Sequence, residues 1–594
     1  MENQKAGFDR NQLIGFLLIA AIMVGFGWWQ STNAPEGDTT TIVESPDNTG
    51  EEDSPEVSKN DLSAITDTLD VPDSSAFEAQ ELTIENENLK LTYSTLGAQL
   101  LRAQIKGYQT YDSNSVYLVD RNQTWDIKLP GEGGLGNKEF EVVSQQSGSM
   151  VLSDGSTQVK INLPETGFIA SYSISGNSGV TGQPEMIWNR TAYRTEKGVS
   201  TERVYSTYCY KLVEDGDVEN LSGRGGDDQE DVEALDWLAQ KQHFFSYIIQ
   251  PEQGFKSANI STENGTDENE NIVKKYASTA TLNQNISGEY TLPFSIYLGP
   301  NHYQTLKDLD QDYEKVINFG WGIFGWIGRG VVVPIFNWLD GYGWSYGVII
   351  LIMVLIIKGA LSPLTFASYR SMAKMRVLKP QIEAINEKFG EKDAVAKQQA
   401  QMALYREAGV NPLGGCIPVL VQMPILFAMF RFFPASIELR GQSFLWATDL
   451  STYDALISWE SHIPILSTLY GNHISIFTLL MTASTILYTR MNQSMTASTG
   501  NAAQMKQMQI IMYLMPLIFM FVLNSYPAGL TYYYFLSNIV TFGMQWAIRR
   551  SVNDEAILAK IEAKKAQPKK QSKFQSRLEE MQRQQNLNRS QRRK

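Results

Sequence analysis

Six long apolar stretches constrain the fold of this chain more than any other feature of its sequence. Each has close to the roughly 20 residues that a helix needs to cross the hydrocarbon core of a bilayer. Because backbone groups in lipid must be hydrogen-bonded within the protein, this pattern predicts a polytopic α-helical membrane protein with six spans. We interpret the first span as an uncleaved anchor, because its apolar core is long for a secretory signal. The six stretches are residues 12–29, 344–365, 416–433, 472–489, 508–525 and 530–548.

Charged residues divide the chain into one acidic and two basic parts. Residues 31–320 hold 47 of the 64 acidic residues against 20 basic ones, whereas residues 549–594 hold 14 basic against 5 acidic residues. The segment 369–415 is also net basic, with 8 bases against 5 acids. Because cytoplasmic loops carry an excess of Lys and Arg, both basic segments are expected in the cytoplasm. Six spans then leave both termini in the cytoplasm and residues 31–320 outside it. In a bacterium with two membranes, the spans would lie in the inner membrane and residues 31–320 in the periplasm.

The outer part divides further by composition, since 594 residues exceed what one core can organise. Residues 1–30 form the anchor. Residues 31–80 are rich in Thr, Ser, Asp, Glu and Pro, which predicts a disordered acidic linker. Residues 81–316 alternate short apolar runs with turn signals, which predicts a large antiparallel β-sandwich domain.

The remaining residues predict a membrane domain and a tail. Residues 317–548 contain five spans, preceded by an interfacial helix over 317–341, for which a short buried helix is the alternative. A cytoplasmic helical hairpin is predicted over 370–414, and its length favours a docking surface for a partner over a simple connector. The basic tail, 549–594, suits ribosomal RNA or anionic lipid, with a plain topology signal as the alternative. Its candidate contacts are Lys564, Lys565, Lys569, Lys570, Arg592 and Arg593.

The apolar run "LIMVLIIKGALSPLTF" (351–366) contains one cation, Lys358. A charge at the centre of a membrane helix costs about 2.5–3.5 kcal/mol on insertion scales, so such a residue is usually functional or hidden. Ser362 and Thr365 share its helical face. Snorkelling of the long side chain to the cytoplasmic headgroups is the alternative.

Other spans repeat this polar spacing. Together the stripes predict a water-containing cavity among the helices, although single Ser and Thr hydroxyls often bond the carbonyl of their own preceding turn. The polar positions are Gln422 in the third span, Thr478, Thr482, Thr485 and Thr489 in the fourth, and Tyr534, Asn538, Thr541 and Gln545 in the sixth.

The fifth span instead carries methionines at helical spacing. Met508, Met512 and Met515 lie on one face with Met505. Flexible thioether side chains can accept many apolar partners, so this face could guide an apolar segment, and ordinary helix packing is the alternative.

Motifs of catalysis are absent from the sequence. It contains no phosphate-binding loop, dinucleotide fingerprint, HExxH or CxxC pair, and its four histidines are scattered. Two cysteines in regions of opposite character exclude a disulfide framework. We therefore expect neither an enzyme nor a cofactor.

Three segments, "SYRSMAKMRVLKPQI", "MALYREAGVNPLGGCIPVLVQMPI" and "YPAGLTYYYFLSNIVT", resemble the YidC/Oxa/Alb family of membrane protein insertases, in its long form. The resemblance implies a periplasmic β-supersandwich and a five-helix core with a hydrophilic groove that bears one positive charge. It places the groove cation, usually Arg, on Lys358, and the other groove residues on Gln422, Tyr533 and Tyr534. A Lys keeps the charge but lacks the guanidinium fork.

The function implied by this resemblance is insertion and folding of nascent membrane proteins in the phospholipid membrane. The implied partners are the Sec translocon, the ribosome and the signal recognition particle receptor. A secondary transporter that moves a small anion through the same polar cavity is the alternative from another class. A carbohydrate-binding or sugar-modifying role of the outer domain is a third interpretation.

Overall fold

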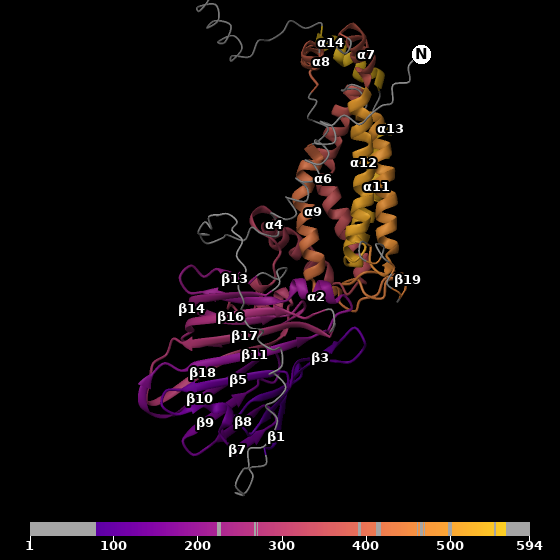
Figure 1. Ribbon diagram of the computed structural model, residues 1–594. Coiled ribbons are helices and arrows are strands. Elements are labelled where there is room, and N and C mark those ends of the chain that lie inside the picture. The colour runs from indigo at the N-terminus through magenta and orange to yellow at the C-terminus, as the bar shows by residue number, and fades with distance from the viewer. Residues whose placement is uncertain are drawn as a thin grey trace, which may run out of the picture.

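The computed structural model describes most of the chain between residues 79 and 565. The predicted anchor, nearly all of the linker, and the tail beyond residue 565 lie outside the described residues. The described part comprises a β domain and a column of helices that rises from one side of it (Figure 1). The described ranges are 79–221, 227–266, 269, 271–389, 394–410, 417–459, 461, 463, 467, 470–496, 502–551 and 554–565.

The β domain contains two antiparallel sheets. The smaller has four strands in chain order: β1 (Glu81–Glu85), β2 (Leu89–Ser94), β3 (Leu100–Gln109) and β4 (Ser115–Asp120). The larger has 14 strands, in the order β6-β5-β11-β17-β16-β14-β15-β18-β10-β9-β8-β7, with β12 beside β14 and β13 beside β12. Its strands are β5 (Gln123–Leu129), β6 (Gly133–Gly134), β7 (Glu141–Gln146), β8 (Ser149–Ser153), β9 (Thr157–Asn162), β10 (Ile169–Gly182), β11 (Glu185–Tyr193), β12 (Thr207–Leu212), β13 (Val218–Asn220), β14 (Asp228–Lys241), β15 (Phe245–Pro251), β16 (Phe255–Asn264), β17 (Ile272–Leu282) and β18 (Ile286–Pro300).

The alternation of the sequence produces these sheets directly. In β9 every second side chain is buried, so one face packs inward while the other meets solvent. Both sheets contribute to one core, in which Trp125 meets Tyr172 edge to face with ring centroids 4.7 Å apart. The predicted antiparallel β-sandwich domain is therefore confirmed in its class.

The helical part follows the apolar stretches. Two short helices of the β domain, α2 (Val199–Tyr205) and α3 (Tyr303–Lys307), precede it. Its own helices are α4 (Gly322–Ile327), a π-turn (Gly328–Val332), α5 (Val333–Asp340), α6 (Tyr346–Val377), α7 (Lys379–Phe389), α8 (Ala394–Ala408), α9 (Ile417–Ala435), α11 (Ile476–Thr496), α12 (Ala502–Leu523), α13 (Ala528–Ser551) and α14 (Asp554–Lys565). Short strands β19 (Ile457–Ser458) and β20 (His473–Ile474) pair in the loop before α11.

Among the described residues, two helical stretches are long and apolar enough to cross a membrane, Gly322–Asp340 and Tyr346–Val377. The apolar parts of α9, α11 and α12 are shorter, at Leu420–Ala435, Ile476–Met491 and Ile510–Leu523. Polar side chains interrupt the apolar character of α13. Length and hydropathy of the described helices thus support a membrane domain without fixing six spans.

The predicted interfacial helix begins at Gly322 rather than at residue 317, because Gly320, with φ of +99°, turns the chain just before it. The stretch lies beside α9, near the β domain (Figure 1). Its inner side chain Phe336 packs in one cluster with Trp237 of the β domain and Phe432 of α9. Its outer side chains Trp321, Ile323, Trp326 and Trp338 are exposed.

The helical hairpin is shorter than the predicted 370–414, because α6 continues as one helix to Val377. Its arms, α7 and α8, lie at the far end of the column from the β domain (Figure 1). The predicted basic tail, 549–594, contains a helix, α14. Ile557 and Ile561 of this helix pack in one cluster with Leu378, Ile382 and Leu404 of the hairpin region. The far end is therefore a small cluster formed by α7, α8, α14 and the last turns of α6.

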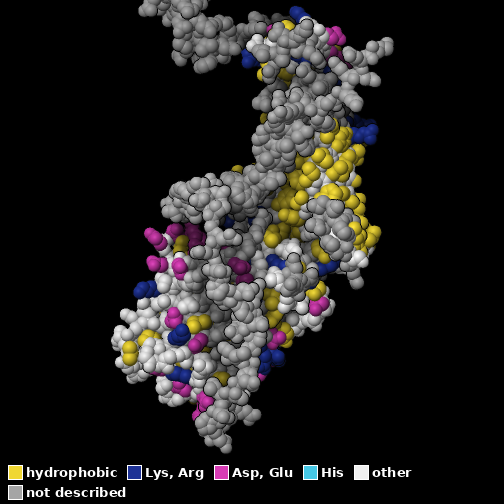
Figure 2. Space-filling model, in the orientation of Figure 1, with side chains coloured by type: hydrophobic (Ala, Val, Ile, Leu, Met, Phe, Trp, Pro, Cys, Tyr) yellow, Lys and Arg dark blue, Asp and Glu magenta, His cyan; other side chains and the backbone are white. Residues whose placement is uncertain are grey.

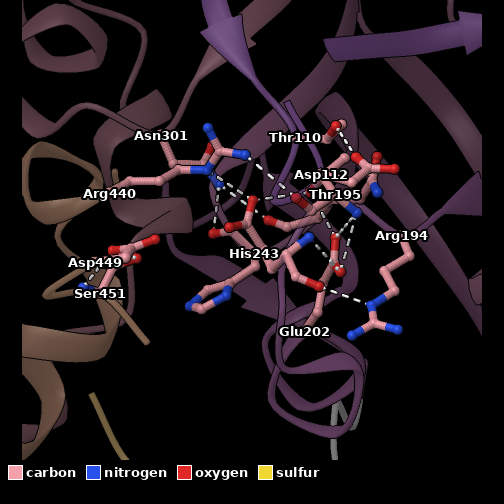
Figure 3. Close-up of polar contacts among 12 residues, drawn as sticks. Thr110, Asp112, Arg194, Thr195, Glu202, His243, Asn301, Arg440, Asp449 and Ser451 are labelled. Carbon is pink, nitrogen blue, oxygen red and sulfur yellow. Dashed lines mark hydrogen bonds and ion pairs between the residues drawn. The ribbon is translucent and has the colours of Figure 1, made fainter. Parts of the chain in front are cut away.

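A buried polar junction joins the β domain to the outer end of the helices (Figure 3). Arg440, which follows α9, forms an ion pair with Glu196, with Nε 2.7 Å from Oε1. His243 Nε2 donates to the carbonyl oxygen of Pro434, at 2.7 Å. Burial lowers the pKa of His243 to about 3, so this ring is neutral.

The junction also buries a second carboxylate, Glu202, beside Glu196. The Thr195 hydroxyl lies 3.0 Å from Glu196 Oε1 and 2.7 Å from Glu202 Oε1. A hydroxyl has one proton to donate, so the second contact requires a proton on a carboxyl group. Burial and the neighbouring Glu196 raise the pKa of Glu202 to about 8. We conclude that the pair holds one proton at neutral pH.

We expect this pair to make the protein less stable as pH rises. The ordinary glutamate pKa is 4.5 and that of folded Glu202 is about 8, so between these values only the folded state keeps the proton. The stabilisation is fully present below pH 4.5 and is lost as pH rises through about 8. Thermal unfolding midpoints of the detergent-solubilised protein, measured across this range, should fall less steeply for Glu202→Gln than for the wild type. The exposed Glu185→Gln is the control and should keep the wild-type slope; equal slopes in all three proteins contradict the shared proton.

Candidate functional site

The polar site centres on Lys358, near the middle of α6. Its side chain is only 7% exposed, and its ammonium donates to Gln422 Oε1 of α9 at 3.2 Å. No carboxylate of the described residues forms an ion pair with it. An ammonium has three N–H donors, and one is used here. Lys358 is thus a buried cation with spare donors and no counter-charge in the described chain.

Prolines add polar backbone groups to this region. Pro363 lies inside α6 and has no N–H, so the carbonyl of Gly359, four residues earlier, loses its helical donor. That carbonyl is adjacent in sequence to Lys358. Pro424 has the same effect on the carbonyl of Leu420 in α9. The two helices that carry Lys358 and Gln422 therefore each have a backbone carbonyl near this pair that lacks its usual donor four residues later.

Most of the predicted hydroxyls bond within their own helices. Thr365 donates to the carbonyl of Leu361 at 3.0 Å, and Ser362 beside it is half-buried. In α11, Thr482 donates to the carbonyl of Thr478 at 2.8 Å, and Thr485 donates to that of Met481 at 2.7 Å. These bonds are the back-bonding pattern that the sequence left open as an alternative.

Two further threonines also donate their hydroxyl protons to carbonyl groups, one within its own helix and one to a neighbouring helix. Thr541 of α13 donates to Ser537 at 2.6 Å, while the fully buried Thr478 of α11 donates to the carbonyl of Leu523 at 3.2 Å. Because these hydroxyl protons are already used, the threonines contribute acceptors rather than free donors.

Asn538 of α13 joins two helices. Its amide donates to Ser484 Oγ and to Thr485 Oγ1 of α11, both at 2.9 Å. Ser484 was not expected at the site, because it lies outside the threonine stripe of the sequence. Near the opposite end of α13, Gln545 donates to Tyr369 of α6. Side-chain amides therefore link α13 to α11 and to α6.

The predicted tyrosines lie in the N-terminal part of α13. Tyr533 is buried, with its ring 5.6 Å from that of Phe433 of α9, and Tyr534 is half-buried. The helices α6 and α13 pack against each other, and each also contacts both α9 and α11. The structure thus places the predicted polar residues on four neighbouring helices. It links Lys358 to Gln422 and Asn538 to Thr485, and no hydrogen bond joins these two pairs.

The methionine face is only partly described. Met512 and Met515 are half-buried on α12, whereas the side chain of Met508 lies outside the described residues. Apolar side chains of the helical column gather on its surface (Figure 2). Exposed ones are Leu420, Val421 and Met423 on α9, and Ile510, Leu517, Ile518, Phe519, Phe521 and Val522 on α12.

The predicted basic contacts lie at the edge of the described chain. Lys564 and Lys565 end α14, but their side chains are not described. Lys569, Lys570, Arg592 and Arg593 lie outside the described residues. Within the described residues no group of His, Cys, Asp and Glu is arranged to hold a metal ion.

Comparisons with known proteins cover nearly the whole chain. Residues 338–555 match the family described as "60Kd inner membrane protein", and residues 81–333 match "YidC periplasmic domain". A membrane protein insertase YidC of Parabacteroides distasonis is 36% identical over 633 residues, covering 97% of each chain. Another from Bacteroides fragilis is 34% identical over 612 residues, covering 97% of this chain and 98% of its own. A solved structure described as an active YidC insertase covers 79% of this chain and 93% of that chain at 19% identity, with a TM-score of 0.33.

We expect the contact between Lys358 and Gln422 to contribute measurably to stability. A hydrogen bond to a charged group is worth about 1.5–3 kcal/mol, and it is lost when either partner becomes apolar. A double-mutant cycle of Lys358→Met and Gln422→Leu, read by thermal unfolding in detergent, should give a coupling energy of about 1.5 kcal/mol. Thr541→Val replaces Gln422→Leu in the control cycle and should give no coupling. A zero value in the first cycle shows that the contact does not form.

Proposed function

Because this chain belongs to the YidC family of membrane protein insertases, we propose that it inserts integral membrane proteins into the bacterial inner membrane and helps them fold. Its clients are nascent membrane proteins. The β domain, which matches the periplasmic domain of the family, lies outside the cytoplasm in this proposal. Family membership over almost the full length is the main support.

The proposed topology has six spans with both termini in the cytoplasm. The first span is residues 12–29, and the five-helix core consists of α6, α9, α11, α12 and α13. Two features support this orientation. The basic segment that contains α7 and α8 lies at the far end of the column from the acidic β domain (Figure 1). The exposed tryptophans of the Gly322–Asp340 stretch lie near the β domain, at the level expected for the outer interface.

The observation that carries the mechanism is the burial of Lys358 without a carboxylate partner. A buried charge is costly unless water or an opposite charge compensates it. We propose that Lys358 and Gln422 line a hydrated groove that is open toward the cytoplasm. An acidic or polar outer segment of a client would enter this groove and exchange its water for the ammonium and amide in stages. The barrier is lower than the full desolvation that bare lipid would impose.

The remaining steps follow from charge and burial. An acidic segment that crosses toward a positive outer side gains about 2.3 kcal/mol per charge for every 100 mV. The client's apolar segment would then move past the exposed apolar side chains of α9 and α12 and the half-buried Met512 and Met515 into lipid. Leaving water provides its driving force. No nucleotide is needed.

The cytoplasmic end is the proposed docking surface for the machinery that delivers clients. Here α14 packs on the α7–α8 hairpin, so the basic tail begins directly beside the hairpin. This arrangement suits joint contact with the ribosome or the signal recognition particle receptor, through Lys564, Lys565 and the basic residues beyond. Cooperation with the Sec translocon is a further part of the proposal.

We expect charge reversal at Lys358 to abolish insertion of clients with acidic outer segments. Lys358→Glu and Lys358→Ala should reduce insertion in proteoliposomes by about tenfold or more, because attraction to the carboxylates is lost, whereas Lys358→Arg should be tolerated. Site-specific photocrosslinks from Gln422 and Met512 to stalled clients should weaken in parallel. The control Lys160→Glu makes the same charge change at an exposed position of β9 in the β domain and should leave insertion unchanged. Full growth of a depletion strain on Lys358→Glu rejects the attraction mechanism.

A further inference from the structure

A second group of cations lies at the outer end of the helical column, where the β domain, the α4–α5 stretch and α9 meet. It consists of Lys241 at the end of β14, Arg431 in α9, and Arg329 in the π-turn. Lys241 follows Trp237 and Ala239 along the strand face that packs in the same cluster as Phe432. Its side chain is only 6% exposed.

Both arginine side chains lie beside the same short segment of backbone, residues 320–325. An added Cβ at Gly320 would lie 3.7 Å from Cγ of Arg431, and one at Gly325 would lie 3.1 Å from an Nη atom of Arg329. The stretch is held there by contacts between α4 and α9, among them Phe324 against Phe427 with ring centroids 5.2 Å apart. Lys241 lies near enough to Arg431 for the two charges to repel. Burial is the main cause that lowers the pKa of Lys241, Cys209 opposes this lowering, and Arg431 adds the smallest effect, which lowers the pKa.

These three cations have no counter-charge in the described chain. None of their side chains has a hydrogen bond or an ion pair there. Like charges close together repel, and a buried ammonium without an acceptor is costly. Topology does not explain them, because the positive-inside rule favours Lys and Arg on the opposite side of the membrane. The arrangement therefore calls for an anion from outside the chain.

The surroundings identify the kind of anion. Beside the cations, Trp321, Ile323 and Trp326 of the α4 region expose apolar surface, and Trp residues concentrate at membrane interfaces. Phosphate groups of phospholipids lie at that depth, and guanidinium groups bind phosphate with paired hydrogen bonds. We propose that Lys241, Arg431 and Arg329 form a site for the phosphate of an anionic phospholipid of the outer leaflet, whose acyl chains lie against the exposed side chains of α4. The site rests on the proposed membrane orientation.

The test is lipid binding by the full-length protein in mild detergent. Native mass spectrometry with added phosphatidylglycerol should show a bound lipid, and Arg431→Gln with Lys241→Gln should weaken binding by about tenfold. Arg329→Gln, at an exposed position that folding does not require, should weaken it by a smaller factor. The control Lys128→Gln removes an exposed cation of the β domain that is paired with Glu185, and it should bind lipid like the wild type.

Three other results would contradict the proposal. Equal retention of phosphatidylglycerol by all variants removes the three cations from lipid binding. Equal binding of phosphatidylcholine shows that the apolar surface alone holds lipid, and displacement by millimolar inorganic phosphate shows a site for a free anion. Client insertion, measured with the same variants in proteoliposomes, separates this proposal from the proposed function, because Lys358 and Gln422 are intact in all of them.

Discussion

The burial of one ammonium group among packed helices is the constraint on which the rest of the membrane domain depends. Lys358 is almost inaccessible, and its one hydrogen bond in the described chain is to Gln422. A helix bundle can keep such a charge only if its neighbours supply dipoles, water or an anion. Pro363 and Pro424 fit this requirement, because each releases a backbone carbonyl on the helices that carry the pair. Prolines also interrupt helices elsewhere, at Pro434 of α9 and Pro516 of α12. Pro363 and Pro424, however, lie close in sequence to the buried charge and its partner.

The elements with strong periodicity could be predicted from the sequence, and contacts between distant segments could not. Apolar runs indicated the long helices, and alternation indicated the β-sandwich. The end of α6 was missed, because its last turns are as helical in pattern as the hairpin itself. The helix α14 was missed because basic residues dominate its composition, although Ile557 and Ile561 provide a narrow apolar face. The shared proton of Glu196 and Glu202 was invisible, since it depends on Arg440, more than 200 residues away in sequence.

The junction determines how the two parts of the protein act on each other. An isolated surface ion pair contributes little, but Arg440 and Glu196 are both shielded from solvent, and His243 adds a hydrogen bond to the chain that follows α9. Removing one partner would leave the other charge buried and uncompensated. The β domain is therefore fixed to the adjacent end of the helical core. This connection also holds the α4–α5 stretch between the β domain and the core. A rigid connection at this end of the helices is compatible with the proposed groove, which would open at the opposite end.

The hydrogen bonds of the threonines change the interpretation of the polar stripes. A threonine hydroxyl that already donates to its own helix can accept a bond from a client, but it offers no proton to a carboxylate. Thr365, Thr482, Thr485 and Thr541 are all of this kind. Asn538 spends its amide protons on Ser484 and Thr485. In the proposed groove, unused donors remain on Lys358 and on the amide nitrogen of Gln422, and of these two only Lys358 carries a charge. Selectivity of the proposed groove for acidic segments thus depends on the lysine charge, while the hydroxyls make the walls tolerable to water. An ammonium attracts a carboxylate from many directions, whereas a guanidinium favours a paired geometry, so a lysine here suits clients whose acidic residues vary in position.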